Sequence, residues 1–342
     1  MSDSGATASA QNSRGKTILI VVAAMLLIVL PVLPWLSRGL NQRSAENQVK
    51  ASGGRASYGK RLFEEADYVT DEKREGKSMI GDLFGDPFVE QLTQVELRKP
   101  LENRRVLNSL RKLHYLEILD ASGANFNDRD LALLSNCPSL KKLWINDSQV
   151  TNAGLEAISS LPELMSLSLE GMEIDDSAMD AVSKHVNLKR LYVKDTKVGD
   201  AGIAKLTGLS RLLGVGLEGT AITNAALQEI VKISTLKELR LSETAITDDG
   251  TAPIGLLPNL QALYLNDTAL TTAGVSWLAD CENLEVVELA GTKVTDGVIN
   301  VLAAMPKLVS VNLRRTAVSQ SAVDELRKQV ETVQSDFSEL AR

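Results

Sequence analysis

The sequence predicts a right-handed α/β solenoid, in which one continuous parallel sheet lines the concave side and short helices cover the convex side. The first observation is a leucine that recurs every 24 residues from Leu92 to Leu308 without a slip. The second is that each interval holds one short strand pattern followed by one short helix pattern. A fixed period in this range indicates one supersecondary unit stacked on its neighbours. Ten such repeats occupy residues 92–331.

The first half of each repeat has the pattern of a strand. With the anchor leucine as position 1, positions 4 and 6 are also apolar, as Leu191 and Val193 are in the fifth repeat. This alternation is typical of a strand with one buried face, so positions 3, 5 and 7 point away from the core. Position 9 is threonine in six successive repeats, and we expect its hydroxyl to bond backbone groups of the adjoining turn. These threonines are Thr196, Thr220, Thr244, Thr268, Thr292 and Thr316.

The second half of each repeat has the pattern of a short helix. Apolar residues fall at positions 16, 19 and 22, as in Leu155, Ile158 and Leu161, which is helical spacing with one buried stripe. Thr, Asp and Asn at positions 12 and 13 suit a helix N-cap. Position 13 is aspartate in Asp128, Asp176, Asp200, Asp248 and Asp296. A ladder of calcium ions is one interpretation of this column, but helix capping is the simpler one.

Together these residues read L-x-x-L-x-L-x-x-T-x-I-T-D-x-G-L-x-x-L-x-x-L-P. The pattern resembles the leucine-rich repeat, with threonine where many such repeats carry asparagine, and it is similar to the 24-residue bacterial variety with a helical convex side. The preceding region also resembles that of bacterial membrane-anchored leucine-rich repeat proteins, in Lys50-Ala51-Ser52-Gly53-Gly54 up to Tyr58 and in Ile80–Phe88. The resemblance implies the fold and leaves the ligand open, because leucine-rich repeats serve unrelated functions.

A second strong feature lies near the N-terminus, where 21 uncharged and mostly apolar residues separate Lys16 from Arg38. A helix of this length crosses a hydrocarbon core of about 30 Å, so residues 17–37 are predicted to form a single-pass anchor in the cell membrane. A cleaved signal peptide is the competing interpretation, but the apolar run is long for one and no small-x-small site follows it. The flanking cations are Arg14 and Lys16 on one side and Arg38, Arg43 and Lys50 on the other. Their count leans only slightly toward a cytoplasmic solenoid, so both orientations stay open.

The remaining segments differ from the repeats in composition. We expect residues 1–16 to form a tail, 38–60 a polar juxtamembrane linker for which partial helix stays open, 61–91 an N-terminal cap and 332–342 a C-terminal cap or tail. The cap region 61–91 holds three of the five phenylalanines, Phe63, Phe84 and Phe88. A solenoid end needs such a cover because its core would otherwise face water.

Composition argues against catalysis, cofactors and nucleic acid. The net charge of −7 gives no general case for nucleic-acid binding. Cys137 and Cys281 fall six repeats apart, on the order of 29 Å, and therefore cannot form a disulfide. His185 occupies the same core column as Cys137, but two repeats separate them by about 10 Å, too far to share a zinc ion. His114 lies just before an anchor leucine, and no motif places a nucleophile beside a base.

The concave face is the candidate binding site, because aromatic and basic side chains alternate there. Such a composition is typical of binding hot spots, although a solvated charged face is the plainer alternative. The candidate binding residues are Lys142, Trp144, Arg190, Tyr192, Lys194, Arg240 and Tyr264. Among them, Gly214, Gly216 and Gly219 of the sixth repeat are expected to leave bare backbone.

The sequence therefore favours a membrane-tethered, non-enzymatic binding scaffold, monomeric, with a protein or peptide partner on the concave face. An acidic partner would match the cations of that face. The runner-up is a cell-envelope structural protein or one that recognises an anionic glycan, with the aromatic rings as sugar platforms. A ubiquitin-ligase-type adaptor and an enzyme are less favoured, because no F-box-like helical segment and no catalytic motif precede or interrupt the repeats.

Overall fold

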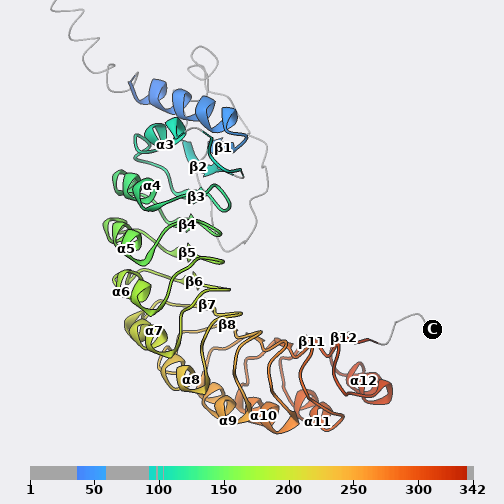
Figure 1. Cartoon of the computed structure of the whole chain (residues 1–342). Helices are drawn as coiled ribbons and strands as arrows, with labels where there is room; N and C mark the ends of the chain where they lie inside the picture. The colour runs from blue at the N-terminus through green and yellow to red at the C-terminus, as the bar shows by residue number, and fades with distance from the viewer. Residues whose placement is uncertain (1–36, 59–91, 98, 103, 337–342) are drawn as a thin grey trace, which may run out of the picture.

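The computed structural model describes residues 37–58, 92–97, 99–102 and 104–336. These residues form a curved stack in which the strands lie along the inner side of the arc and the helices along the outer side (Figure 1). The strands form one 12-stranded sheet in chain order from β1 to β12. β1 pairs with β2 antiparallel, and every later neighbouring pair is parallel. The parallel solenoid expected from the 24-residue period is thereby confirmed.

The strands of the sheet are β1 (Arg55–Tyr58), β2 (Leu92–Glu96), β3 (Ile118–Asp120), β4 (Lys142–Trp144), β5 (Ser166–Ser168), β6 (Arg190–Tyr192), β7 (Gly214–Gly216), β8 (Glu238–Arg240), β9 (Ala262–Tyr264), β10 (Val286–Glu288), β11 (Ser310–Asn312) and β12 (Thr332–Gln334). The α-helices are α3 (Arg105–Leu110), α4 (Asp128–Ala132), α5 (Asn152–Leu155), α6 (Met179–Val182), α7 (Asp200–Ala204), α8 (Asn224–Ile230), α9 (Asp248–Thr251), α10 (Thr272–Ser276), α11 (Val298–Ala303) and α12 (Gln320–Leu326). Short 3₁₀ turns extend the convex side: η2 (Leu133–Asn136), η3 (Glu156–Ser160), η4 (Asp176–Ala178), η5 (Lys205–Gly208), η6 (Ala252–Leu256) and η7 (Trp277–Asp280).

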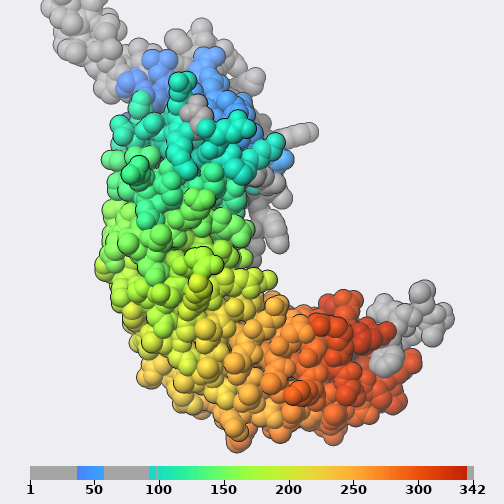
Figure 2. Space-filling view, viewed as in Figure 1, coloured from blue at the N-terminus to red at the C-terminus, as the bar shows by residue number. Residues whose placement is uncertain are grey.

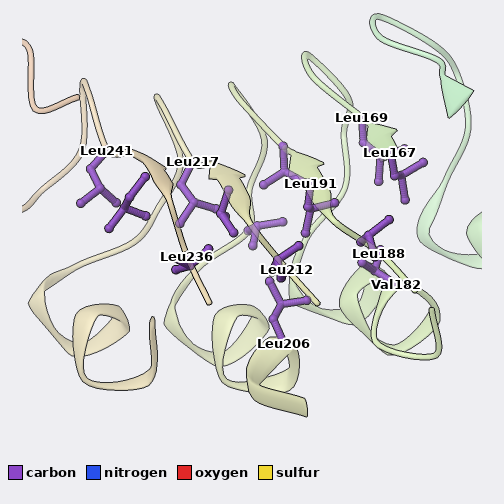
Figure 3. Packing of buried hydrophobic residues seen from close by; sticks show 14 of the residues in the cluster. Leu167, Leu169, Val182, Leu188, Leu191, Leu206, Leu212, Leu217, Leu236 and Leu241 are labelled. Carbon is purple, nitrogen blue, oxygen red and sulfur yellow. The ribbon is translucent and has the colours of Figure 1, made fainter. Parts of the chain in front are cut away.

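The core is a set of leucine columns that runs through the stack. Because the parallel strands pair in register, Leu167, Leu191 and Val215 lie directly side by side at position 4. Figure 3 shows Leu167 and Leu191 of this column between the strands and the helices, with Leu188 and Leu212 of the anchor column nearby. The constant register means that each position of the repeat forms a continuous column, including the positions that face solvent on the concave side.

The threonine column has the structural role expected from the sequence. In all six repeats the hydroxyl donates to the backbone carbonyl three residues earlier, at 2.5–2.7 Å, for example from Thr196 to Val193 and from Thr244 to Leu241. This bond satisfies a carbonyl in a turn where water has little access. The side chain therefore fixes the turn after each strand and is not part of a ligand site.

The structure corrects the expectation that the position-13 aspartates cap the helices of their own repeats. The N-cap is position 12, as with Thr151 and Thr223, while the position-13 carboxylate bonds the following repeat. Asp128 Oδ1 accepts the Thr151 N–H at 2.8 Å, and Asp200 Oδ1 accepts the Thr223 N–H at 2.8 Å. The five aspartates of this column thus tie their repeats to the ones that follow, by accepting a backbone N–H in every case and a hydroxyl in four.

The N-terminal end of the stack is covered by a helix over residues 37–51 and by β1 (Figure 1). Ala45 and Val49 of this helix are fully buried in the common core. The buried Gln42 accepts the Leu92 N–H through Oε1 at 2.6 Å, at the start of β2. Much of the segment 38–60, assigned to a linker from its polar composition, therefore packs against the first repeat.

The expected end segments are described in part. The predicted cap at residues 61–91 and the tail at 1–16 lie outside the described residues, as does the predicted anchor at 17–37 except for Ser37. No helix among the described residues has the length and apolar character needed to cross a bilayer. At the other end, β12 adds one strand beyond the tenth repeat.

Candidate binding site on the concave face

The register of the sheet places the candidate binding residues in two adjacent columns. Position 3 carries, from β4 to β9, Lys142, Ser166, Arg190, Gly214, Glu238 and Ala262. Position 5 carries Trp144, Ser168, Tyr192, Gly216, Arg240 and Tyr264. Both columns face the hollow of the arc that the space-filling view shows (Figure 2).

Arg240 is the centre of the best-defined group on this face. Its guanidinium lies 5.5 Å from the ring centroid of Tyr192 and 5.0 Å from that of Tyr264. Both rings attract the cation through the negative potential of their faces, and the attraction grows as water is excluded. Three predicted residues from three different strands, β6, β8 and β9, therefore form one aromatic–cation–aromatic group, here called the Tyr–Arg–Tyr group.

The contact between Tyr192 and Arg240 depends on the strand between them. Gly216 of β7 separates the two residues in the position-5 column. A Cβ at Gly216 would lie 2.7 Å from Cδ1 of Tyr192, a distance that real Cβ contacts do not show. The missing side chain lets the tyrosine ring lean over β7 and reach an arginine two repeats away.

The structure corrects the expectation of bare backbone in the sixth repeat. Gly214 and Gly216 are both buried. Side-chain atoms of Arg190 and Glu238 lie 3.4–3.6 Å from the Cβ position of Gly214, and Tyr192 covers Gly216. The glycines therefore let their neighbours close over β7 and do not open a pocket, while Gly219 remains partly exposed.

Two glutamates that were not among the candidates complete the Tyr–Arg–Tyr group. Glu238 Oε1 accepts from Arg240 Nε at 2.5 Å, and Glu218 Oε1 lies 3.8 Å from an Arg240 terminal nitrogen. Burial opposes the charged form of Arg240, but Glu238 and Glu218 raise the arginine pKa above its ordinary value. Positions 3 and 7 were both assigned to the concave face, so the same rule that selected the cations would have selected these glutamates.

The electrostatics of the group are those of a half-buried cluster. Burial raises the pKa of Glu218, and Glu170 adds to that rise, while Arg240 and Lys194 oppose it. Burial likewise raises the pKa of Tyr264. Arg240 is thus held by two rings and two carboxylates, and its side chain keeps 37% of its exposure. Because these contacts restrain the arginine, the exposed part of its guanidinium has a fixed orientation toward solvent.

The other four predicted residues lie around this group. Lys142 Nζ lies 5.9 Å from the Trp144 ring, forming a second cation–aromatic pair on β4. β5, with Ser166 and Ser168, separates this pair from Tyr192. Arg190 shares β6 with Tyr192, and Lys194 Nζ lies 3.8 Å from its neighbour Asp195. The structure therefore brings three predicted residues into contact and places four beside them.

Groups that could carry chemistry are engaged or buried in the described part of the chain. Burial raises the pKa of Cys137 to about 12 and that of Cys281 to about 11, and each thiol donates to a backbone carbonyl. Burial also lowers the pKa of His185, while a hydrogen bond between its side chain and the backbone of Leu161 acts to raise it. Within the described ranges, no three His, Cys, Asp or Glu side chains gather in a way that could hold a metal ion.

Comparison with known proteins agrees with the solenoid fold. The leucine-rich repeat family matches residues 136–159 and 232–255. The crystal structure of an internalin, inlF, from Listeria monocytogenes is similar with a TM-score of 0.52 at 18% identity, over 73% of this chain and 83% of the internalin. The solenoid is a leucine-rich repeat fold. No curated protein matches the chain.

Two further leucine-rich repeat structures resemble the chain more loosely. Internalin C2 from Listeria monocytogenes is 20% identical with a TM-score of 0.41, over 67% of this chain and 83% of that protein. The ectodomain of the membrane receptor kinase GASSHO1/SCHENGEN3 from Arabidopsis thaliana, in complex with CASPARIAN STRIP INTEGRITY FACTOR 2, is 20% identical with a TM-score of 0.47. That match covers 67% of this chain and 28% of the ectodomain. At these identities the likeness concerns the fold.

Proposed function

We propose that this chain is a membrane-tethered, non-enzymatic scaffold that binds a protein or peptide partner on the concave face of its leucine-rich repeats. The observation that carries the proposal is the Tyr–Arg–Tyr group, which is preformed and half-exposed in the middle of that face. Tyrosine and arginine dominate binding hot spots because they bury large areas with few rotatable bonds. Their fixed arrangement reduces the ordering cost that a partner would otherwise meet.

The expected charge of the partner depends on which cations of the concave face already have a carboxylate of this chain beside them. Glu238 and Glu218 largely balance Arg240. Arg190 forms no ion pair among the described residues, and Lys194 has only an exposed contact with Asp195. An acidic segment that runs past β6 would meet these two cations, while its apolar or aromatic side chains would pack on the tyrosines.

The glycan alternative is less well supported. A sugar platform needs an open aromatic face, and Arg240 lies over one face of both Tyr192 and Tyr264. Trp144 likewise has Lys142 above its ring. The arrangement suits a partner that adds contacts around an arginine already in place.

The membrane tether is proposed from the apolar sequence at residues 17–37. Such a segment would hold the solenoid at the cell membrane in a single pass and raise its effective concentration near membrane partners. Which side of the membrane the repeats occupy is a separate matter. Protease digestion of intact cells, with detection of the repeats, would decide it.

The experiment that tests the binding site uses the full chain in nanodiscs as bait. Wild-type protein and a Tyr192→Ala/Arg240→Ala/Tyr264→Ala variant are exposed to the same cell extract, and the variant is also checked by circular dichroism. A partner retained by the wild type and lost with a folded variant supports the concave site. Equal retention by both proteins would place the site elsewhere, and a glycan array run in parallel tests the alternative class.

A further inference from the structure

We infer that the N-terminal end of the solenoid is a docking surface for anionic phospholipid headgroups, so that the stack of repeats stands end-on against the membrane. This inference rests on the tether of the proposed function but is independent of the concave partner. It is carried by three observations: the charge of this end, the direction of the helix over residues 37–51, and two exposed apolar side chains.

Basic residues gather at this end of an acidic protein. Among the described residues of 37–115 there are nine Lys and Arg against three Asp and Glu, whereas the whole chain has a net charge of −7. The exposed cations are Arg38, Arg43, Lys50, Arg55, Lys99, Arg105, Arg111 and Lys112. They come from the covering helix, β1 and α3 or the turns beside them, which Figure 1 places together at one end of the arc. Such a cluster attracts an anionic bilayer when it lies within about a Debye length, or ~8–10 Å, of the surface.

Part of this positive charge lies on the face of the helix over residues 37–51 that points away from the repeats. Its buried stripe is Gly39, Gln42, Ala45 and Val49, and its outward stripe is Leu40, Arg43, Ser44, Asn47 and Lys50. The outward stripe lies on the face opposite the core, at the very end of the stack. The apolar sequence 17–37 leads directly into this helix, so the tether would bring the same stripe to the bilayer.

Two of the six exposed large apolar side chains among the described residues lie at this end. Leu40 is 61% exposed and Tyr115 is 38% exposed. Arg38 lies over the Tyr115 ring at 5.1 Å from its centroid, which joins the start of the helix to the end of the first repeat. A leucine and a tyrosine among arginines and lysines form the composition of surfaces that lie in the headgroup region.

An end-on position has a consequence for the proposed partner site. From β2 to β8 the sheet advances by six strand spacings of ~4.8 Å, so Arg240 would lie roughly 30 Å above the docked end. The Tyr–Arg–Tyr group would then point parallel to the membrane surface, at that distance from it. A partner anchored in the same bilayer would need to extend about 30 Å from the membrane to contact the group.

The test uses the full chain in nanodiscs of phosphatidylcholine alone or mixed with phosphatidylserine. A full chain is required because residues 59–91 add nine acidic and five basic side chains to the balance. One dye is placed at Asn108→Cys near the docked end and, in a second protein, at Glu331→Cys at the far end, since both positions are exposed and both native cysteines are buried. Energy transfer to headgroup-labelled lipid is then measured.

Anionic lipid should raise transfer from the near dye and lower it from the far dye. Arg43→Glu/Arg111→Glu/Lys112→Glu should abolish this dependence, because each cation near the surface favours docking about fivefold and three together about a hundredfold. The matched change Lys293→Glu/Lys307→Glu/Arg314→Glu alters net charge equally at distant exposed positions and should leave the dependence intact. Identical transfer in both lipids, or equal loss with both variants, would overturn the inference. Flotation of the discs separates this outcome from a failed tether, in which the chain does not enter either kind of disc.

Discussion

The Oδ1 atom of Asp195 lies 2.2 Å from the position that a Cβ on Gly219 would occupy. Both residues are at position 8 of their repeats, and both have a positive φ, 54° and 62°. The same relation joins Asp147 to Gly171, at 2.2 Å, and Asp267 to Gly291, at 2.1 Å. In each pair the aspartate side chain lies over the next repeat's turn, where only glycine leaves room for it. The glycine that follows each of these three aspartates in the position-8 column is therefore a packing requirement.

Gly219→Ala is expected to destabilise the fold by about 1–2 kcal/mol or more, because it adds both a left-handed alanine and a collision with Asp195. The measurement is the denaturant midpoint of unfolding. Asp195→Gly in the same protein should recover the part of the loss that comes from the collision. Gly208→Ala, where a Cβ meets nothing within 4 Å, is the control and should change the midpoint little. Equal effects at Gly208 and Gly219 would show that the turn geometry does not matter.

Removing Tyr192 or Arg240 is expected to weaken partner binding about thirtyfold, the effect of losing a hot-spot contact of about 2 kcal/mol. Trp144→Ala and Arg190→Glu, on the surrounding positions, should weaken it less. Binding is measured by titration with the captured partner. Leu191→Ala on the same strand should instead cost about 2–5 kcal/mol of stability, since it faces the core. Unchanged affinity in both the Tyr192 and Arg240 variants would exclude the concave group.

Asp296 offers a test of the ties between repeats. Its Oδ1 and Oδ2 accept the backbone N–H and the hydroxyl of Ser319, at 2.6 and 2.8 Å, and these bonds lower the pKa of the carboxyl. Because the folded pKa lies below the unfolded one, the stabilisation is present above the unfolded pKa and is lost as pH falls through the folded pKa. Asp296→Ala should therefore be less stable than wild type at neutral pH, with a difference that narrows in acid.

The natural asparagines of the same column provide the matched variant. Asn152 and Asn224 accept the equivalent N–H of Asp175 and Thr247 at 3.1 and 3.0 Å. Asp296→Asn should keep the backbone bond, lie between wild type and Asp296→Ala in stability at neutral pH, and show a flatter pH profile. An alanine variant with the wild-type pH profile would contradict a role for the carboxylate.

Cys137 and Cys281 are expected to resist alkylation in the folded protein. Burial raises their pKa values to about 12 and about 11, so at pH 8 little thiolate forms and no reagent reaches it. Labelling by a maleimide dye should proceed only after a denaturant is added. Labelling of the native protein at the rate of a free thiol would show that the core opens far more readily than its packing indicates.

Truncation at the N-terminus should distinguish the tether from the cover of the first repeat. Deletion of residues 1–36 is expected to give a soluble, folded protein, because the helix over 37–51 stays in place. Deletion of residues 1–51 should lower the unfolding temperature, since it exposes the core beside Ala45 and Val49 and leaves the Leu92 N–H without Gln42. Retention of the shorter deletion in the membrane fraction would reveal a second attachment.

The strands, the core columns and the threonine bonds follow from the 24-residue period. Because the register of the sheet is constant, residues 24 positions apart in the sequence lie side by side on neighbouring strands. The period also places Tyr192, Arg240 and Tyr264 in one column. It does not show that Tyr192 reaches over Gly216, since that contact depends on the side-chain conformation of the tyrosine. Nor does it show the cover helix, whose buried stripe includes Gly39, Gln42 and Ala45 and therefore looks polar in sequence. The position-13 carboxylates were assigned to local capping because a bond to a residue 23 positions later leaves no local signature.

The reach of Tyr192 across Gly216 sets a limit on how this protein can evolve. In most of the solenoid one 24-residue unit could be gained or lost by unequal recombination, and every remaining column would still be in register. Between repeats five and eight the same event would separate Tyr192 from Arg240 or remove the glycine between them. Asp267 and Arg315, which pair at 2.8 Å across Gly291, impose the same constraint nearer the C-terminus. Related chains that differ in their number of repeats should therefore differ outside these two stretches. Within each stretch, the number of repeats between the paired residues should stay constant.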